Sequence, residues 1–396
     1  VEISFMPKKL AFNPDALHPF WYKQNVSPPK SWEKWDGLMS ALAKNLVEHF
    51  GIEEVATWYF EVWNEPNIDF WGGIPRDKSY YELYEHTAKD LKAVSSRLRV
   101  GGPSTAAAQW VPSFLKYVKA HNVPIDFVSS HGYADEEIDN IYPDDPSVPR
   151  NTPMDDRVCL AVHKVRKEID DAGMKQLPLF WTEWNVQYDS QARDTTFVGP
   201  GVAHTILGCD GAVQQMSFWT FSDVFEEGGP GDRPFSGQFG LRAEFGINKP
   251  SFYDFALLHK LGTERMVNAS KDAIVTRTAD GGLAIAVWNI VDPPPTGEKR
   301  SPVADNAGVP RKQITLSIQG VPSRARVTVE RVDDEHGNVL PVYAAMGKPQ
   351  YPTLMQVEEM NRKTALPIPE ATALLNGKLD LSLEPNALVL VKVSGR

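Results

Sequence analysis

Short apolar segments alternate with longer segments of helical spacing through the first 262 residues of the chain. Six of the apolar segments have the length of a strand, and they begin at Val1, Trp58, Arg99, Phe127, Leu179 and Ala212. Between the first two, Leu38, Leu42, Leu46 and Phe50 show the four-residue steps of a helix that Gly51 ends. This alternation predicts a parallel sheet whose strands are joined by crossover helices.

Polar groups follow these strands at their carboxyl ends, which is the side where eight-stranded (β/α) barrels place their chemistry. We therefore expect a (β/α)8 TIM barrel. If the strand that ends at Thr220 is the eighth, the first strand present is the third, and the first two strand–helix units are absent from this chain. The alternative is an open sheet of six strands. It is disfavoured because nothing would then cover the edge of the first strand.

The pattern changes after residue 262, where segments alternate as antiparallel strands do. These segments are 273–277, 283–289, 313–318, 325–332 and 379–393. They predict an accessory antiparallel β-sandwich over residues 263–396, appended to a catalytic barrel over residues 1–262. Residues 346–366 form a partly helical insertion between the strands.

Two of the strands end in the same way. Trp58–Trp63 leads into Asn64-Glu65-Pro66, and Leu179–Thr182 leads into Glu183-Trp184-Asn185. A carboxyl group at the end of an apolar strand is half buried, and burial disfavours its charged form, so that Glu65 can remain a proton donor near neutral pH. Two carboxyl groups at the ends of parallel strands are what acid-assisted glycoside cleavage requires.

Composition excludes several other classes of protein. The net charge of -10 leaves no basic stripe for nucleic acid, and no run of about 20 apolar residues is present to span a membrane. The nine histidines are scattered and no Cys or His pair has ligand spacing, so we expect no metal and no cofactor. Cys159 and Cys209 are expected to be free buried thiols, which favours a reducing, cytoplasmic location, although an export signal upstream of Val1 would not be visible.

The chain resembles glycoside hydrolase family 39, and in particular its bacterial β-xylosidase branch. The resemblance lies in the stretches 4–7, 21–30, 63–67, 130–131, 181–185, 218–227, 237–241 and 248–250. It implies a retaining mechanism in which Glu65 is the acid/base and Glu183 the nucleophile. It also implies that these residues follow barrel strands four and seven, which agrees with the strand count.

Three residues near the two carboxyl groups are expected to assist them. His131 and Tyr133, at the end of their strand, are predicted donors beside Glu183, which must stay ionised. Asn64 is predicted to bind the hydroxyl next to the anomeric carbon, a contact that strengthens in the transition state. A core histidine remains the alternative for His131.

The last strand of the barrel contributes further candidates. Trp219 is predicted to stack under the apolar face of the sugar, with barrel core as the alternative. Glu226 and Glu227 are predicted to bind distal sugar hydroxyls, as the resemblance implies, although adjacent carboxylates are usually a solvated loop. Asp223 and Arg233 are expected to pair and shape the same loop.

The predicted function is an exo-acting β-xylosidase that releases xylose from xylo-oligosaccharides. The loops 12–35 and 135–153 are expected to close the cleft into a pocket. Alternatives are α-L-arabinosidase or α-L-iduronidase activity, or a carbohydrate-binding barrel without activity. The acidic stretch 223–227 disfavours the iduronidase, whose substrate carries a carboxylate. The sequence leaves the oligomeric state open.

Overall fold

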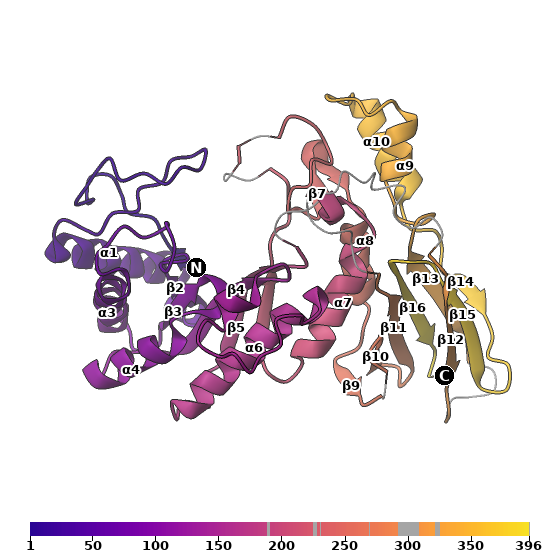
Figure 1. Ribbon diagram of the computed structural model, residues 1–396, viewed down its shortest axis with the longest axis horizontal. Helices are drawn as coiled ribbons and strands as arrows, with labels where there is room; N and C mark the ends of the chain where they lie inside the picture. The colour runs from indigo at the N-terminus through magenta and orange to yellow at the C-terminus, as the bar shows by residue number, and fades with distance from the viewer. Residues whose placement is uncertain are drawn as a thin grey trace.

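The computed structural model describes residues 1–187, 191–224, 228–229, 231–268, 270–291, 309–320 and 325–395. These residues form a parallel sheet with helices on its outer face, followed by antiparallel sheets at the carboxyl end of the chain (Figure 1). No helix among them combines the length and the apolar character needed to cross a bilayer.

The parallel sheet has six strands, which lie side by side in sequence order. They are β1 (Glu2–Ile3), β2 (Tyr59–Val62), β3 (Arg99–Thr105), β4 (Phe127–Tyr133), β5 (Leu179–Asn185) and β6 (Gln215–Phe218). All neighbouring pairs are parallel, and the sheet curls as half of a barrel does. The predicted parallel sheet and its strand order are confirmed.

Eight helices connect or follow these strands in the described part of the chain. They are α1 (Trp32–Phe50), α2 (Ile52–Val55), α3 (Arg76–Val94), α4 (Val111–His121), α5 (Ile138–Ile141), α6 (Met154–Asp171), α7 (Val198–Cys209) and α8 (Pro250–Leu258). The short α2 and α5 were not expected from the sequence. Because all six strands run parallel, their carboxyl ends lie at one edge of the half-barrel, together with the polar residues that follow them.

Helix α1 lies where its leucine spacing predicts, but it buries a different row of residues. The Ser31 side chain accepts a hydrogen bond from the Lys34 amide at the start of the helix. The buried residues are Trp35, Met39 and Ala43, and the Trp35 indole donates to Thr87 of α3 at 3.0 Å. The leucine row flanks this face because the larger tryptophan, with its hydrogen bond, sets the rotation of α1 against α3.

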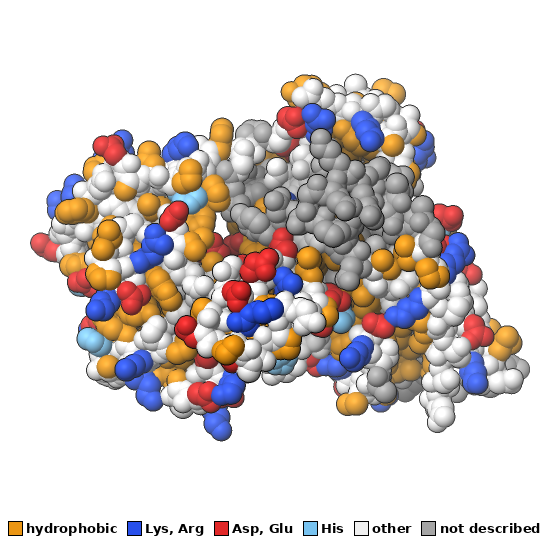
Figure 2. Space-filling model, viewed as in Figure 1, with side chains coloured by type: hydrophobic (Ala, Val, Ile, Leu, Met, Phe, Trp, Pro, Cys, Tyr) orange, Lys and Arg blue, Asp and Glu red, His pale blue; other side chains and the backbone are white. Residues whose placement is uncertain are grey.

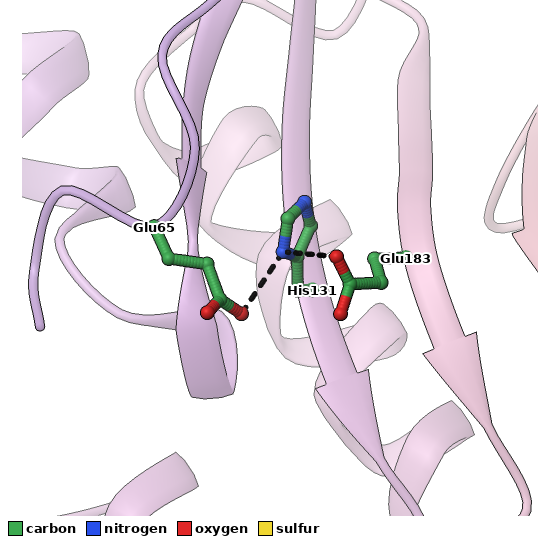
Figure 3. A group of neighbouring side chains, drawn as sticks. All are labelled: Glu65, His131 and Glu183. Carbon is green, nitrogen blue, oxygen red and sulfur yellow. Dashed lines mark hydrogen bonds and ion pairs between the residues drawn. The ribbon is translucent and has the colours of Figure 1, made fainter. Parts of the chain in front are cut away.

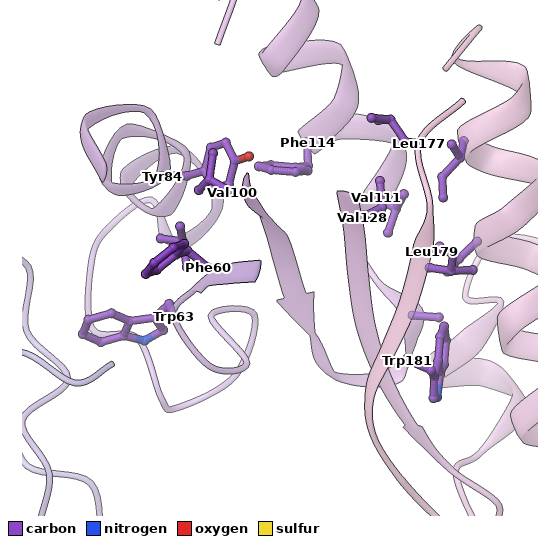
Figure 4. Close-up of a cluster of buried hydrophobic side chains, with 14 of the residues drawn as sticks. Phe60, Trp63, Tyr84, Val100, Val111, Phe114, Val128, Leu177, Leu179 and Trp181 are labelled. Atoms are coloured by element: carbon purple, nitrogen blue, oxygen red, sulfur yellow. The ribbon is translucent and has the colours of Figure 1, made fainter. Parts of the chain in front are cut away.

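The core of the half-barrel lies between the sheet and the helices, where large side chains interdigitate (Figure 4). Phe60 and Val62 of β2 are 0% exposed, as are Tyr84 of α3 and Phe114 of α4. Trp63 is also fully buried, and its indole donates to the Phe70 carbonyl at 2.8 Å. This packing fixes the direction in which the chain leaves β2, immediately before Glu65.

The carboxyl-terminal region contains a six-stranded sheet in the order β14-β13-β16-β11-β10-β9 and a separate β12–β15 ladder. The strands are β9 (Glu264–Met266), β10 (Ala273–Arg277), β11 (Leu283–Asn289), β12 (Lys312–Ser317), β13 (Val327–Val332), β14 (Glu370–Thr372), β15 (Lys378–Leu383) and β16 (Ala387–Val393). Every pair is antiparallel, and both sheets contribute to one hydrophobic cluster. Strands β10 to β13 match predicted segments, the predicted segment 379–393 holds the two strands β15 and β16, and β9 and β14 were not predicted.

The helical insertion between these strands consists of α9 (Leu340–Ala345) and α10 (Leu354–Thr364). It packs against β7 (Arg242–Ala243) and β8 (Ile247–Asn248), a small hairpin that follows the last strand of the parallel sheet. Helix α10 lies in the insertion predicted over residues 346–366, whereas α9 precedes that range and the contact with the hairpin was not predicted.

The prediction of free thiols is wrong. Cys159 of α6 and Cys209, the last residue of α7, form a disulfide with their Cα atoms 5.0 Å apart. The two cysteines are separated by 50 residues in the sequence, but α6 and α7 follow the neighbouring strands β4 and β5 and pack side by side. The preference for a reducing, cytoplasmic location rested on free thiols and loses that support.

Candidate active site

Three ionisable side chains meet at the carboxyl edge of the half-barrel (Figure 3). Glu65 follows β2, His131 lies on β4, and Glu183 lies on β5. One ligand-type atom of each, a carboxylate oxygen or a ring nitrogen, lies within 4.8 Å of those of the other two. Figure 2 shows acidic side chains gathered around a hollow near the middle of one face of the molecule.

The backbone at Glu65 is held in an unusual conformation. Trp63 has φ of 71° and Glu65 has φ of 43°, both in the left-handed region that non-glycine residues seldom adopt. The Glu65 amide donates to the Ser104 carbonyl of β3 at 2.9 Å, and the Glu65 residue is 8% exposed. The turn therefore aims the Glu65 side chain across the edge of the sheet, and its neighbours hold it there.

His131 links the two carboxyl groups. Its Nδ1 lies 3.0 Å from Glu65 Oε1, a hydrogen bond, and 3.6 Å from Glu183 Oε2. Burial opposes protonation of this fully enclosed ring, but the charge of Glu183 and the hydrogen bond to Glu65 outweigh it. The pKa of His131 is raised to about 10. His131 therefore carries a positive charge between two carboxyl groups at neutral pH.

Tyr133 completes the surroundings of Glu183. It lies two residues after His131 on the same strand and is 7% exposed. Its hydroxyl donates a hydrogen bond to Glu183 Oε1. The structure thus brings both expected donors to Glu183, with the difference that the hydrogen bond of His131 goes to Glu65. Contact of either residue with a sugar stays a prediction.

The other predicted sugar-binding residues are placed as follows. Asn64 is partly buried and immediately precedes Glu65. Trp219 is partly buried at the end of β6, where its amide donates to the Trp184 carbonyl at 2.8 Å and its carbonyl accepts from Asn185 Nδ2 at 2.6 Å. Glu226 and Glu227 lie outside the described residues.

Comparison with known proteins identifies the family. Residues 1–378 match the family described as Glycosyl hydrolases family 39. The chain belongs to this family. A β-xylosidase of Caldicellulosiruptor saccharolyticus is 34% identical over 99% of this chain and 79% of its own length. A β-xylosidase of Geobacillus stearothermophilus is 33% identical over 99% of this chain and 76% of its own length.

A solved structure supports the same conclusion for the fold. A monomeric β-xylosidase from Caulobacter crescentus CB15 matches 100% of this family 39 chain and 80% of that chain, with a TM-score of 0.86 and 32% identity. The protein is therefore a glycoside hydrolase with a carbohydrate substrate, and the predicted family is confirmed.

The geometry of the site fits the retaining mechanism of family 39. Retaining glycosidases have carboxyl groups about 5 to 5.5 Å apart, whereas inverting enzymes separate them by about 6.5 to 9.5 Å to admit a water. One oxygen of Glu65 lies within 4.8 Å of one oxygen of Glu183, a close approach that agrees with the shorter spacing.

The same three side chains have the spacing of metal ligands, and so do Asp155, Asp156 and His204 on the outer helices. In the first group, Nδ1 of His131 lies 3.0 Å from Glu65 Oε1 and 3.6 Å from Glu183 Oε2. Because this nitrogen faces both carboxyl groups, catalysis by the two carboxyl groups accounts for the trio better than coordination of a cation does.

The sequence did not reveal a second group of charged residues, which is buried in the segments that follow β5 and β6. Lys249 is 0% exposed and lies between Asp194 and Asp223. The expected pairing of Asp223 with Arg233 is wrong, because Asp223 pairs with Lys249 and Arg233 pairs with its neighbour Asp232. The stretches 237–241 and 248–250 carry part of the family resemblance, but their residue types do not indicate a buried ion pair.

Proposed function

We propose that this family 39 protein is a retaining exo-β-xylosidase that releases xylose from the non-reducing end of xylo-oligosaccharides. The proposal is supported by two relatives named β-xylosidase, each aligned with 99% of the chain. The observation that carries the catalytic part is the approach of Glu65 and Glu183 around a shared histidine.

In the proposed reaction, Glu65 gives a proton to the glycosidic oxygen while Glu183 attacks the anomeric carbon and forms a covalent glycosyl-enzyme. Glu65 then takes a proton from a water molecule that attacks the anomeric carbon. The bond between the sugar and Glu183 breaks, Glu183 leaves as a carboxylate, and the sugar is released with its configuration retained. The hydrogen bond from Tyr133 to Glu183 favours the ionised nucleophile before attack.

The proposed contacts with the sugar come from the residues around this pair. Asn64 would hold the hydroxyl next to the anomeric carbon, and Trp219 would stack on the apolar face of the ring. Glu226 and Glu227 would bind the distal hydroxyls, which together with the closing loops 12–35 and 135–153 would limit cleavage to a chain end.

We further propose that the half-barrel is part of a closed (β/α)8 barrel, with the catalytic domain over residues 1–262 and an accessory β-sandwich over residues 263–396. In the described part of the chain β1 pairs only with β2, and β6 pairs only with β5. A cavity of about 500 Å³ lies beside β1, and it is lined by Glu2, Ser4, Phe5, Met6, Tyr22, Gln24 and Asn25. Two further strand–helix units would cover these edges and this cavity.

The test uses the full-length protein and 4-nitrophenyl glycosides of β-D-xylose, α-L-arabinose and β-D-glucose. We expect the highest kcat/KM for the xyloside, and an initial sugar product of retained configuration by proton NMR. Preference for another glycoside would refute the substrate, and an inverted product would refute the mechanism.

Two variants then test the assignment of the carboxyl groups. Glu65→Ala with a dinitrophenyl xyloside should be limited by deglycosylation, and azide should restore turnover and give the retained β-xylosyl azide. Glu183→Gly should be inactive, and azide should give the inverted α-xylosyl azide. Exchange of the two azide configurations between the variants would reverse the assignment.

A further inference from the structure

A buried cluster of three charged residues joins the segments that follow β5 and β6 to the residue that precedes α8. We call Lys249, Asp194 and Asp223 the Lys249 cluster. Lys249 Nζ lies 2.6 Å from Asp194 Oδ1 and 2.9 Å from Asp223 Oδ2. The exposed fractions of the three side chains are 0%, 2% and 1%. Burial of three charges is costly, and apolar residues of similar volume often serve the fold as well, so a specific task of the cluster has to be sought.

The cluster holds both ends of one short loop, residues 237–240. The Gly237 amide donates to Asp194 Oδ2 at 2.7 Å, and the Gly240 amide donates to Asp223 Oδ1 at 2.7 Å. Lys249 also donates to the Gln238 carbonyl at 2.8 Å. Hydrogen bonds to charged groups are stronger than neutral ones, and burial excludes competing water, so this loop is held rigidly.

The loop carries Phe239 to the active-site edge. Its ring centroid lies 6.0 Å from that of Tyr133, at an interplanar angle of 64°. The Arg193 guanidinium lies 3.8 Å from the Phe239 ring centroid, and the same side chain donates to the Gly237 carbonyl at 2.7 Å. Phe239 is 8% exposed. It is therefore clamped between a cation and the tyrosine that donates to Glu183.

We propose that Phe239 is a positioning residue that holds the Tyr133 hydroxyl against Glu183. The Lys249 cluster serves the same purpose by fixing the loop that carries Phe239. The inference rests on the proposed role of Glu183 as nucleophile. In this inference the Lys249 cluster fixes the loop 237–240, the loop fixes the ring of Phe239, and that ring holds the Tyr133 hydroxyl at Glu183 Oε1.

Backbone hydrogen bonds to Thr220 also hold this loop in place. The Phe239 carbonyl accepts from the Thr220 amide at 3.0 Å, and the Leu241 amide donates back to the Thr220 carbonyl at 3.0 Å. Thr220 directly follows Trp219, whose carbonyl accepts from Asn185. The loop is thus anchored next to Trp219, which is itself hydrogen-bonded to Asn185 on β5, the strand that carries Glu183.

The test is a double-mutant cycle with Phe239→Leu and Tyr133→Phe, measured as kcat/KM on the best nitrophenyl glycoside. Tyr133→Phe should lower kcat/KM on the order of 10- to 100-fold, as expected for loss of a hydrogen bond to a charged group. Phe239→Leu should lower it about tenfold in the wild-type background, with KM within about twofold, because only orientation is lost. In the Tyr133→Phe background, Phe239→Leu should lower kcat/KM less than about twofold.

A matched control separates positioning from loosening of the core. Phe114→Leu removes another buried ring, 0% exposed on α4, which contacts Tyr84 at a centroid distance of 4.8 Å and lies outside the site. It should lower the melting temperature and leave kcat/KM unchanged well below that temperature. An equal loss in Phe114→Leu would attribute the effect of Phe239→Leu to general packing and overturn the inference.

The remaining outcomes distinguish the inference from the proposed function. Equal losses from Phe239→Leu in both backgrounds would overturn the inference and leave the function intact, because Phe239 would then act independently of the tyrosine hydroxyl. If Tyr133→Phe leaves kcat/KM unchanged, the inference fails at its last step. If Glu183→Gly also retains activity, the catalytic assignment fails with it.

Discussion

Removal of the Cys159–Cys209 disulfide should destabilise the half-barrel strongly. The bridge closes a loop of 50 residues. For a loop of about 50 residues, the chain-entropy model gives about 14 cal/mol/K, or about 4 kcal/mol at 25 °C. A domain of 150 to 250 residues loses about 2 to 4 °C of melting temperature per kcal/mol, so the expected decrease is about 8 to 16 °C.

The assay compares thermal unfolding of the oxidised wild type, the wild type reduced with a phosphine, and a variant with both cysteines changed to alanine. The reduced wild type and the variant should melt at similar, lower temperatures, and the reductant should not affect the variant. A thiol titration of the denatured, unreduced wild type should find no reactive thiol. Two thiols per chain in that titration, or a decrease below about 2 °C, would refute the reasoning.

Three further perturbations have defined outcomes. The pKa of His131 is raised from 6.5 to about 10, so the stability that its charge contributes is fully present below pH 6.5 and is lost as pH rises through 10. The free energies of unfolding of wild type and His131→Asn, measured in urea, should therefore become equal near pH 10. If they become equal near pH 6.5, the ring is not charged at neutral pH. Gly199→Ala places a Cβ 2.2 Å from Cγ of the fully buried Asp254, so it should cost about 1 to 3 kcal/mol by urea unfolding, whereas no loss would mean that α7 and α8 separate freely. Lys249→Met leaves two buried aspartates unpaired and should cost about 3 to 5 kcal/mol; changing both partners to asparagine as well should restore part of that stability, and further destabilisation would contradict the charge argument.

The arrangement of the strands was predictable because it depends on local patterns. Strand-length apolar segments, helical spacing and the residues at strand ends suffice to order β1 to β6, and parallel pairing then brings Glu65 and Glu183 to one edge. The rotation of α1 was less accessible, because Trp35 competes with the leucine row for the same neighbour.

The disulfide and the Lys249 cluster could not be predicted, because both join segments far apart in the sequence. An acidic residue such as Asp223, in a loop near the active end of the sheet, is equally compatible with a surface ion pair, a substrate contact or a buried charge. The decision depends on Lys249, 26 residues away, whose ammonium group lies inside the protein. Residue types show which charges exist, but only tertiary packing shows which of them neutralise one another.

The position of His131 follows from the charges in the proposed reaction. Before attack, Glu183 is ionised and Glu65 is protonated. In the covalent intermediate, Glu183 is a neutral ester and Glu65 has given up its proton, so the number of negative charges beside His131 is unchanged. Nδ1 lies 3.0 Å from one carboxyl group and 3.6 Å from the other, so the ring is within ion-pair distance of the charged group at either stage. A protonated histidine between the two carboxyl groups thus meets one carboxylate at each stage, which a neutral ring or a residue bound to only one of them would not do.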